Sequence, residues 1–381
     1  MPILEFTCAT AAFSQAIDTV SHALSPRPVM QDYANILLAA AEDKLTVFAA
    51  DGTIYMSAEI PATVEQPGVA ALDGKLLAET IRKQPSGETK LTASFQRATI
   101  QSGRSRMQMT PKDATTFRDP PKLKDDALDV TLPAGSLQRC IDFVQYAVST
   151  DQTRKVLTGI LLEVSPGKLR TVALDGFRMA IMDAPCQYDG PVVKAIIPKE
   201  SSAELAKLLR NAGSDEVTLR TDGMYLKARI EECEFYTLLV AGEYINYNSV
   251  VPKEEKTLAL VKAKDLRGCI ERAQIMAREG KTNLIRLSFR QDVLTITANA
   301  PNGDFVEDVD CALQGEPLDT AFNCAYVLDA LKNEDAGNLE ISMTNGVRPA
   351  VIRDPEDKDH LQLTLPVRDL ATAPKPEAQS A

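Results

Sequence analysis

The sequence predicts an α+β protein made of three tandem copies of one module, each with two helices packed on antiparallel sheets. One phrase recurs: "TVFAADGTIYM", "TVALDGFRMAI" and "TITANAPNGDF" place Asp51, Asp175 and Asn299 a constant 124 residues apart. Each copy also contains two segments whose apolar residues fall at helical spacing. The period is too long for a solenoid of small repeats, so we predict a triplicated domain. The same step of 124 residues separates Leu37, Leu161 and Ile285.

Two helices are predicted in each copy. Asp73 and Asn323 are good N-cap residues for the second helix in the outer copies, and the stretch from Lys199 to Ser202 gives the middle copy a polar helix start. The first helices are expected at 13–24, 135–148 and 264–277, and the second helices at 72–84, 197–212 and 322–333.

Strands fill the remainder of each copy. Segments such as "GKLRTVAL" alternate with period two, and Gly-containing turns separate them. We expect a hairpin turn at Asp51, Asp175 and Asn299 in the three copies. Proline and charge clusters mark the boundaries. The predicted modules are residues 1–126, 127–253 and 254–370, followed by a disordered tail at 371–381.

Composition excludes several function classes. The chain is 44% hydrophobic and 25% charged, lacks a basic segment ahead of its first apolar residues, and is expected to be cytoplasmic. Its seven cysteines are scattered and its histidines number two, so we expect no disulfide framework, metal site or cofactor. An enzyme would need a nucleophile with a base, or a phosphate-binding loop. Asp175 is the best lone candidate, but turn formation explains it more simply, and we predict a protein that is not an enzyme.

The charge distribution allows two interpretations. A net charge of −11 argues against a nucleic-acid partner, since phosphate binding requires clustered Lys and Arg. The six predicted helical segments, with the fifth counted to residue 281, however, carry +3, which leaves −14 on the remainder of the chain. Either these cations lie on solvated helix faces, or a basic helical lining inside an acidic shell contacts phosphates weakly and without sequence preference.

The chain closely resembles the bacterial DNA polymerase III beta subunit family, the sliding clamps, over residues 3 to 370. The resemblance rests on the order and spacing of several phrases: "SGRSR", "LRTVALDGFRMA", "VVPK", "LTITANAP", "FNCAYVLDAL" and "LPVR". It implies a head-to-tail homodimer that forms a ring, with helices lining the hole through which double-stranded DNA passes. It also implies no membrane association. The implied partners are the replicative polymerase, the clamp loader and repair proteins, which carry a short clamp-binding peptide.

The resemblance places a peptide-binding pocket between the second and third modules. Some positions depart from the family pattern: Phe177 stands where histidine is common, Ile245 where proline is common, and Pro349 replaces a small polar residue. Asn248 and Ser249 stand where arginines are frequent. These departures leave open a specialised or inhibitor-resistant clamp paralogue. The matching positions are Leu157, Leu174, Gly176, Phe177, Arg178, Met179, Ile245, Val250, Asn323, Tyr326, Val347, Pro349, Leu365, Pro366, Val367 and Arg368.

Two further sets of residues follow from the same resemblance. The implied DNA contacts are Arg27, Lys75, Arg82, Arg154 and Lys199. The implied subunit interface places Met107 and Met109 of the first module against Ile275 and Met276 of the third.

Overall fold

The six predicted helices are present in a computed structural model that describes residues 3–25, 30–115, 117, 120–213, 215–332 and 337–367. Their ends differ from the predicted ones by a few residues. The first helix begins earlier than predicted, and the third ends earlier because its last turn continues as the 3-10 turn Gln145–Ala147. None of the described helices is long and apolar enough to cross a membrane. The helices are α1 (Thr10–Ser21), α2 (Gly74–Arg82), α3 (Ala134–Val144), α4 (Lys199–Asn211), α5 (Ala263–Glu279) and α6 (Cys324–Lys332).

The chain divides into two compact units. Unit 1 comprises residues 1–139, 164–167 and 186–241, and unit 2 comprises residues 140–163, 168–185 and 242–381. The division falls within the predicted middle module. Its residues 127–139, 164–167 and 186–241 belong to unit 1, whereas its residues 140–163, 168–185 and 242–253 belong to unit 2.

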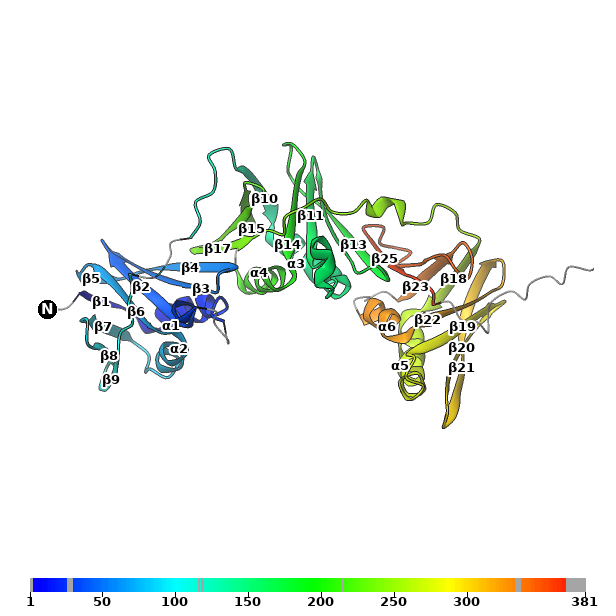
Figure 1. The fold of residues 1–381 in the computed structure, drawn as a ribbon, viewed down its shortest axis with the longest axis horizontal. Helices are drawn as coiled ribbons and strands as arrows, with labels where there is room; N and C mark the ends of the chain where they lie inside the picture. Colours follow the sequence, from blue (N-terminus) through cyan, green and yellow to red (C-terminus); the bar gives the residue numbers. More distant parts are fainter. Residues whose placement is uncertain are drawn as a thin grey trace, which may run out of the picture. The chain divides into compact units, whose positions relative to one another are not determined.

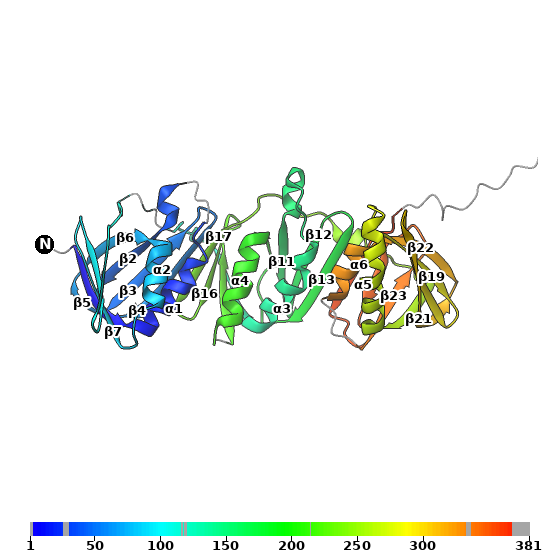
Figure 2. The same ribbon diagram turned by 90° about the horizontal axis from the view of Figure 1, so that it is seen from below.

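Unit 1 contains two antiparallel sheets, with α1 and α2 lying side by side against them (Figures 1 and 2). The apolar side chains of α1, including Phe13, Ile17 and Val20, are buried on this side. The first sheet has the order β5 (Thr63–Gln66), β1 (Leu4–Ala9), β7 (Glu88–Ala93), β8 (Ala98–Ser102) and β9 (Ser105–Met109). The second has the order β10 (Leu128–Pro133), β15 (Glu216–Thr221), β16 (Tyr225–Ile230), β17 (Cys233–Leu238), β4 (Ile54–Pro61), β3 (Lys44–Ala50), β2 (Asn35–Ala41) and β6 (Gly68–Asp73).

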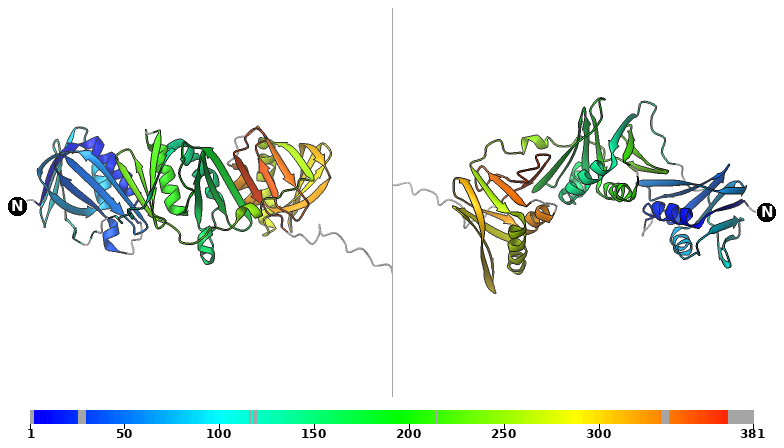
Figure 3. Two further views of the ribbon diagram at one scale, coloured as in Figure 1. Left: turned by 90° about the horizontal axis from the view of Figure 1, so that it is seen from above. Right: turned by 180° about the vertical axis from the view of Figure 1, so that it is seen from behind.

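Unit 2 contains a long run of antiparallel strands, and α5 and α6 lie side by side against part of it (Figure 3). Its core includes Leu266, Ile270, Phe289 and Leu328. The strand order is β12 (Lys168–Leu174), β13 (Arg178–Pro185), β25 (His360–Thr364), β24 (Ala350–Arg353), β23 (Asn338–Met343), β18 (Thr257–Lys262), β21 (Gly303–Gly315), β20 (Val293–Ala300), β19 (Leu284–Arg290) and β22 (Leu318–Asn323). The remaining strands of the chain are β11 (Gly159–Ser165) and β14 (Val193–Pro198).

Neighbouring repeats share sheets through two strand pairs. In unit 1, β17 of the second repeat pairs with β4 of the first, with Cys233 opposite Ala58. In unit 2, β13 of the second repeat pairs with β25 of the third, with Met179 opposite Leu363. Each pair satisfies backbone groups that an edge strand would otherwise expose.

The recurrent Asp-Gly turn has one local cause. The Asp51 carboxylate accepts hydrogen bonds from the backbone N–H groups of Thr53 and Ile54, and Asp175 does the same with the second and third residues that follow it. Each glycine has a positive φ of 95°, a conformation that L-residues rarely adopt. Asp222 and Gly223 repeat this arrangement at a further position.

The predicted turn at Asn299 is wrong by two residues. Asn299 lies within β20 and is paired with Asp304 of β21, while Ala300 pairs with Gly303. The reversal therefore falls at Pro301-Asn302, because proline with its fixed φ supplies a turn former later in this copy.

An ion pair fixes the register of β12 and β13. Arg170 lies opposite Asp183 and donates two hydrogen bonds to its carboxylate, of 2.6 and 2.7 Å, and Lys168 Nζ lies 2.7 Å from the same group. Burial raises the pKa of Asp183, but the bonds from Arg170 and Lys168 outweigh it and hold that pKa below its usual range. The pair therefore stabilises the folded state only where Asp183 is ionised.

We expect Asp183→Asn to lower the free energy of unfolding by about 1–2 kcal/mol at neutral pH, because the charge-assisted bonds are lost. A lowered carboxylate pKa contributes stability above the unfolded pKa of about 3.9. The advantage of the wild type should therefore shrink as the pH falls below about 4. Thermal unfolding of both proteins across this range tests the effect. The control is Asp129→Asn, which removes a carboxylate from an exposed pair with Arg220. If the stability difference between the wild type and Asp183→Asn stays the same at low pH, it does not come from the ionised Asp183 carboxylate.

Candidate functional site

The Asp175 turn forms one wall of the candidate peptide-binding site. Leu174 ends β12 and is buried, and the turn then presents Phe177 at its outer end with 59% of its side chain exposed. Gly176 gives this turn its positive φ. A Cβ at Gly176 would lie 3.4 Å from a guanidinium nitrogen of Arg154, so Arg154 lies beside the turn.

Arg178 holds the turn to the third repeat. Its guanidinium donates to the carboxylate of Asp175 at 2.9 Å and to that of Asp329 on α6 at 2.7 Å. The same group lies 4.6 Å from the ring centre of Tyr326 and 5.3 Å from that of Tyr146. Burial lowers the pKa of Arg178, but the bonds to the two aspartates outweigh it and raise that pKa. The charged Arg178 side chain thus connects the second repeat to the third through its ion pairs with Asp175 and Asp329 and its contacts with two tyrosine rings. We call this arrangement the Arg178 brace.

Strand β25 completes the floor of the site. Its pairing with β13 sets Leu363 opposite Met179, and both are buried. After the strand, the N–H of Leu365 donates to the carbonyl of Phe177 at 2.8 Å, and the N–H of Val367 donates to that of Ala321 on β22. The chain therefore passes from the turn wall to the start of α6, where the Asn323 side chain accepts a hydrogen bond from the N–H of Ala325.

Several of the predicted positions carry exposed apolar side chains. The ring of Phe177 stacks on Tyr326 with a centroid distance of 6.0 Å and an interplanar angle of 26°. The loop residue Val347 is 68% exposed. Leu157 and Pro349 are buried, and Leu365, Pro366 and Tyr326 are partly exposed. Large apolar side chains with substantial exposure are Phe177, Ile245, Val250, Val347 and Val367.

Sequence reasoning missed several residues that shape the site. Leu363 could have been found, because it alternates with Leu365 in "LQLTL". Tyr146 and Asp329 contact Arg178 only through tertiary packing, and no spacing signals them. Arg368 lies outside the described residues, as does the predicted tail at 371–381.

The described DNA-contacting residues of the predicted set lie on three elements. Lys75 and Arg82 are exposed on α2, and Arg82 forms an ion pair of 2.7 Å with Asp18 of α1. Arg154 is exposed within the 3-10 segment Gln152–Leu157 of unit 2. Lys199 is partly exposed at the first position of α4. Arg27 lies outside the described residues.

The predicted interface residues differ in exposure. Met107 on β9 is 38% exposed and Ile275 on α5 is 62% exposed. Met109 is buried within unit 1, and Met276 is partly buried against the core of unit 2. In the isolated chain, Met107 and Ile275 are therefore the two members of this set with more than a third of their surface exposed.

Comparisons with known proteins identify the fold and its parts. Sequence models of the DNA polymerase III beta subunit match in chain order: the N-terminal domain at residues 4–119, the central domain at 131–246 and the C-terminal domain at 248–368. The beta sliding clamp of Bacillus subtilis is 29% identical over 96% of this chain and all of its own length, and that of Escherichia coli K12 is 28% identical over the same shares. The crystal structure of the Bacillus subtilis DNA polymerase sliding clamp superposes with a TM-score of 0.91 and 28% identity, covering 96% of this chain and 99% of that one. The chain therefore belongs to the DNA polymerase III beta subunit family, with three clamp domains in tandem.

Proposed function

We propose that this protein is a DNA sliding clamp with no catalytic activity of its own. Two copies close head to tail into a ring around duplex DNA, and the replicative polymerase, the clamp loader and repair proteins dock on it through a short peptide. Family membership over nearly the whole chain supports the clamp function. The surplus of negative charge outside the helical segments suits a protein that holds DNA by topology and not by affinity.

The observation that carries the docking proposal is the set of exposed apolar side chains on the β12–β13 turn, on the loop after β23 and on the segment after β25. Scattered surface apolar residues are ordinary, but a contiguous group with a polar rim is typical of a binding site. Here hydrogen bonds connect the segments that carry these side chains: Leu365 donates to the Phe177 carbonyl, Val367 to the Ala321 carbonyl, and the Thr320 hydroxyl to the carbonyl of Gly346 beside Val347. Arg178 joins the turn to α6 through Asp329. Burial of each leucine-sized anchor contributes about 1.5–3 kcal/mol, so two or three anchors suffice for a short peptide.

Phe177 favours a second candidate, a specialised clamp with its own partner preference. A stacked phenyl ring offers no hydrogen-bonding group, unlike the histidine that is common at this position in the resembling family. The clamp-binding peptide of the replicative polymerase from the same organism separates the candidates. Binding tighter than that of its scrambled version supports the general clamp, and equal binding supports specialisation.

The ring requires a dimer, and Ile275→Asp is expected to disrupt it. Ile275 is accessible in the single chain, so the change should leave the fold intact, while a buried unpaired carboxylate at the proposed contact with Met107 should abolish the interface. Sedimentation velocity at micromolar concentration should give twice the chain mass of 41.5 kDa for the wild type and the single mass for the variant.

Leu260→Asp, at a 40% exposed position on β18, is the matched control for that experiment and should remain dimeric. A monomeric wild type would contradict the ring. A dimeric Ile275→Asp protein would contradict these interface residues while leaving the ring intact.

A further inference from the structure

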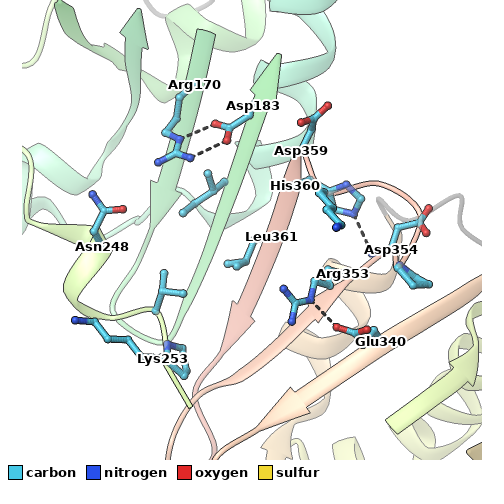
Figure 4. A pocket seen from close by; sticks show the side chains of 15 residues that line it. Arg170, Asp183, Asn248, Lys253, Glu340, Arg353, Asp354, Asp359, His360 and Leu361 are labelled. Carbon is cyan, nitrogen blue, oxygen red and sulfur yellow. Dashed lines mark hydrogen bonds and ion pairs between the residues drawn. The ribbon is translucent and has the colours of Figure 1, made fainter. Parts of the chain in front are cut away.

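Gln362 is a polar side chain buried on the reverse of the sheet that forms the floor of the candidate peptide-binding site. Neighbouring residues of a strand point to opposite faces of the sheet. On β25, Leu363 belongs to the floor, and Leu361 lines the cavity of about 600 Å³ that Figure 4 shows. Gln362 lies between them and therefore points to the other face, where it is fully buried.

That other face packs against α3 of the second repeat. The register sets Gln362 opposite Ala180, and Ala180 opposite Ala173, so the three side chains share one row. Thr171, two residues before Ala173, points the same way, and its hydroxyl donates to the carbonyl of Cys140 on α3. The row therefore lies between the strands and the segment that follows α3, with two small side chains beside the glutamine.

The segment after α3 supplies the partner of Gln362. The 3-10 turn Gln145–Ala147 packs on β12 and β13, where the alanines leave room for a large side chain. The hydroxyl of Tyr146 in this turn donates to the side-chain carbonyl of Gln362. A hydroxyl group of the second repeat is thus bound to a buried amide of the third.

The amide of Gln362 also binds α6. Its Nε2 donates to the carbonyl of Ala330 at 3.0 Å. Ala330 lies in the last turn of α6, whose carbonyl groups have no partner within the helix. A flipped amide would set Oε1 against this carbonyl and its NH₂ group against the tyrosine, so the two contacts together fix the orientation of the side chain.

These contacts form a closed cycle with the Arg178 brace. Asp329, the neighbour of Ala330 on α6, accepts a hydrogen bond of 2.7 Å from Arg178. The guanidinium of Arg178 lies 5.3 Å from the ring centre of Tyr146, and the hydroxyl of that ring is bound by Gln362. Gln362 thus fixes the tyrosine ring on which the Arg178 guanidinium rests, and the same α6 turn receives both side chains.

The Arg178 brace in turn sets the wall of the peptide site. Its guanidinium donates to the carboxylate of Asp175 and packs on the ring of Tyr326, and Phe177 stacks on that same ring. If the guanidinium changed its place, the turn and the stack would lose a common support. A wall that samples several orientations binds more weakly, because only the competent fraction of molecules accepts the peptide.

We propose that Tyr146 and Gln362 are positioning residues of the peptide site. The inference rests on the proposed docking function. The hydrogen bond between the two side chains holds Arg178 in place, and Arg178 holds the turn that carries Phe177. Neither positioning residue needs to touch the peptide. The wall is therefore ordered before the peptide arrives, which removes an entropy cost from binding.

The first test is Tyr146→Phe, which keeps the ring beside Arg178 and removes only the hydroxyl that binds Gln362. We expect the dissociation constant of the clamp-binding peptide of the same organism's polymerase to rise about twofold to tenfold, the range that corresponds to one intramolecular hydrogen bond. Fluorescence anisotropy with the full-length protein measures it, at a temperature well below the thermal unfolding of both proteins.

A second variant ties the effect to the pair. Gln362→Met has a similar length but no amide, and it should also weaken binding. The double variant Tyr146→Phe, Gln362→Met should weaken binding by less than the product of the two single effects, because both changes remove the same hydrogen bond. Effects that multiply fully would contradict action through this bond.

Two comparisons separate positioning from a general loss of stability. Thr89→Val on β7 removes a buried hydroxyl that lies 2.8 Å from the hydroxyl of Thr10 in unit 1, so it should lower thermal stability and leave peptide affinity unchanged. In a Phe177→Ala background, Tyr146→Phe should change the affinity much less, since the ring that it positions is gone.

The outcomes distinguish this inference from the docking proposal. Failure of the wild type to bind the peptide would overturn docking and this inference with it. If the wild type binds the peptide and Tyr146→Phe binds it equally well, docking stands and the positioning role is overturned. An equal loss of affinity in Thr89→Val, or an undiminished effect in the Phe177→Ala background, would overturn the positioning role as well.

Discussion

Linearising a nicked circular plasmid is expected to release this protein, whereas the intact circle retains it. The protein is first loaded with the clamp loader of the same organism and ATP, and the DNA is then passed over a gel-filtration column at physiological salt. Non-specific binding to phosphates has dissociation constants of about 10⁻⁴–10⁻⁶ M under such conditions. A net charge of −11 does not favour tighter binding to phosphates, so we expect retention to come from ring closure.

We expect protein that co-elutes with DNA to fall at least about tenfold after cutting, because a weakly bound ring can slide off an end. Blocking both ends of the linear DNA with bulky bound protein should restore retention. The Ile275→Asp variant should be absent from both forms of DNA, since a monomer cannot close. Equal loss from the circle and the linear form would overturn the topological mechanism.

The second large effect is expected at the peptide site. Phe177→Asp combined with Val347→Asp should weaken binding of the clamp-binding peptide at least about tenfold, equivalent to about 1.4 kcal/mol. Both side chains are more than half exposed, so the fold should tolerate the change. In the complex, however, two carboxylates would lose water against an apolar peptide without gaining partners. Fluorescence anisotropy measures the affinity.

The matched control places the same charges at Val192 and Met224, which are 54% and 56% exposed and lie outside the site. This control should bind the peptide as the wild type does. If the control loses as much affinity as the site variant, net charge and not the pocket is responsible. If the site variant binds normally, these two side chains do not contact the peptide.

Local features of the fold could be predicted from the sequence. The repeat step and the helical spacing led to all six helices, and the Asp-Gly pairs at 51 and 175 form the predicted turns because side chain and glycine act within four residues. The turn at Asn299 was misplaced, since equivalence between copies does not decide which of several turn-forming residues reverses the chain.

Contacts between repeats could not be predicted. The pairing of Met179 with Leu363 joins strands that are far apart in the chain. The alternation of apolar and polar residues predicts each strand, but it does not predict which other strand pairs with it. The brace of Arg178 with Asp329 depends on that pairing in turn. The resemblance therefore pointed to the apolar members of the site and to Arg178, while Asp329 and Tyr146, which contact Arg178, became visible only in the structure.

The pairing of β13 with β25 also sets the order in which the site is made during synthesis. Domains form from the N-terminus as the chain emerges, yet β25 begins at His360 of 381 residues. The turn wall at Asp175 is complete long before its floor exists. A chain that stops short of its last strand therefore lacks part of the proposed docking surface, and we expect partners to engage only subunits that are synthesised through this strand.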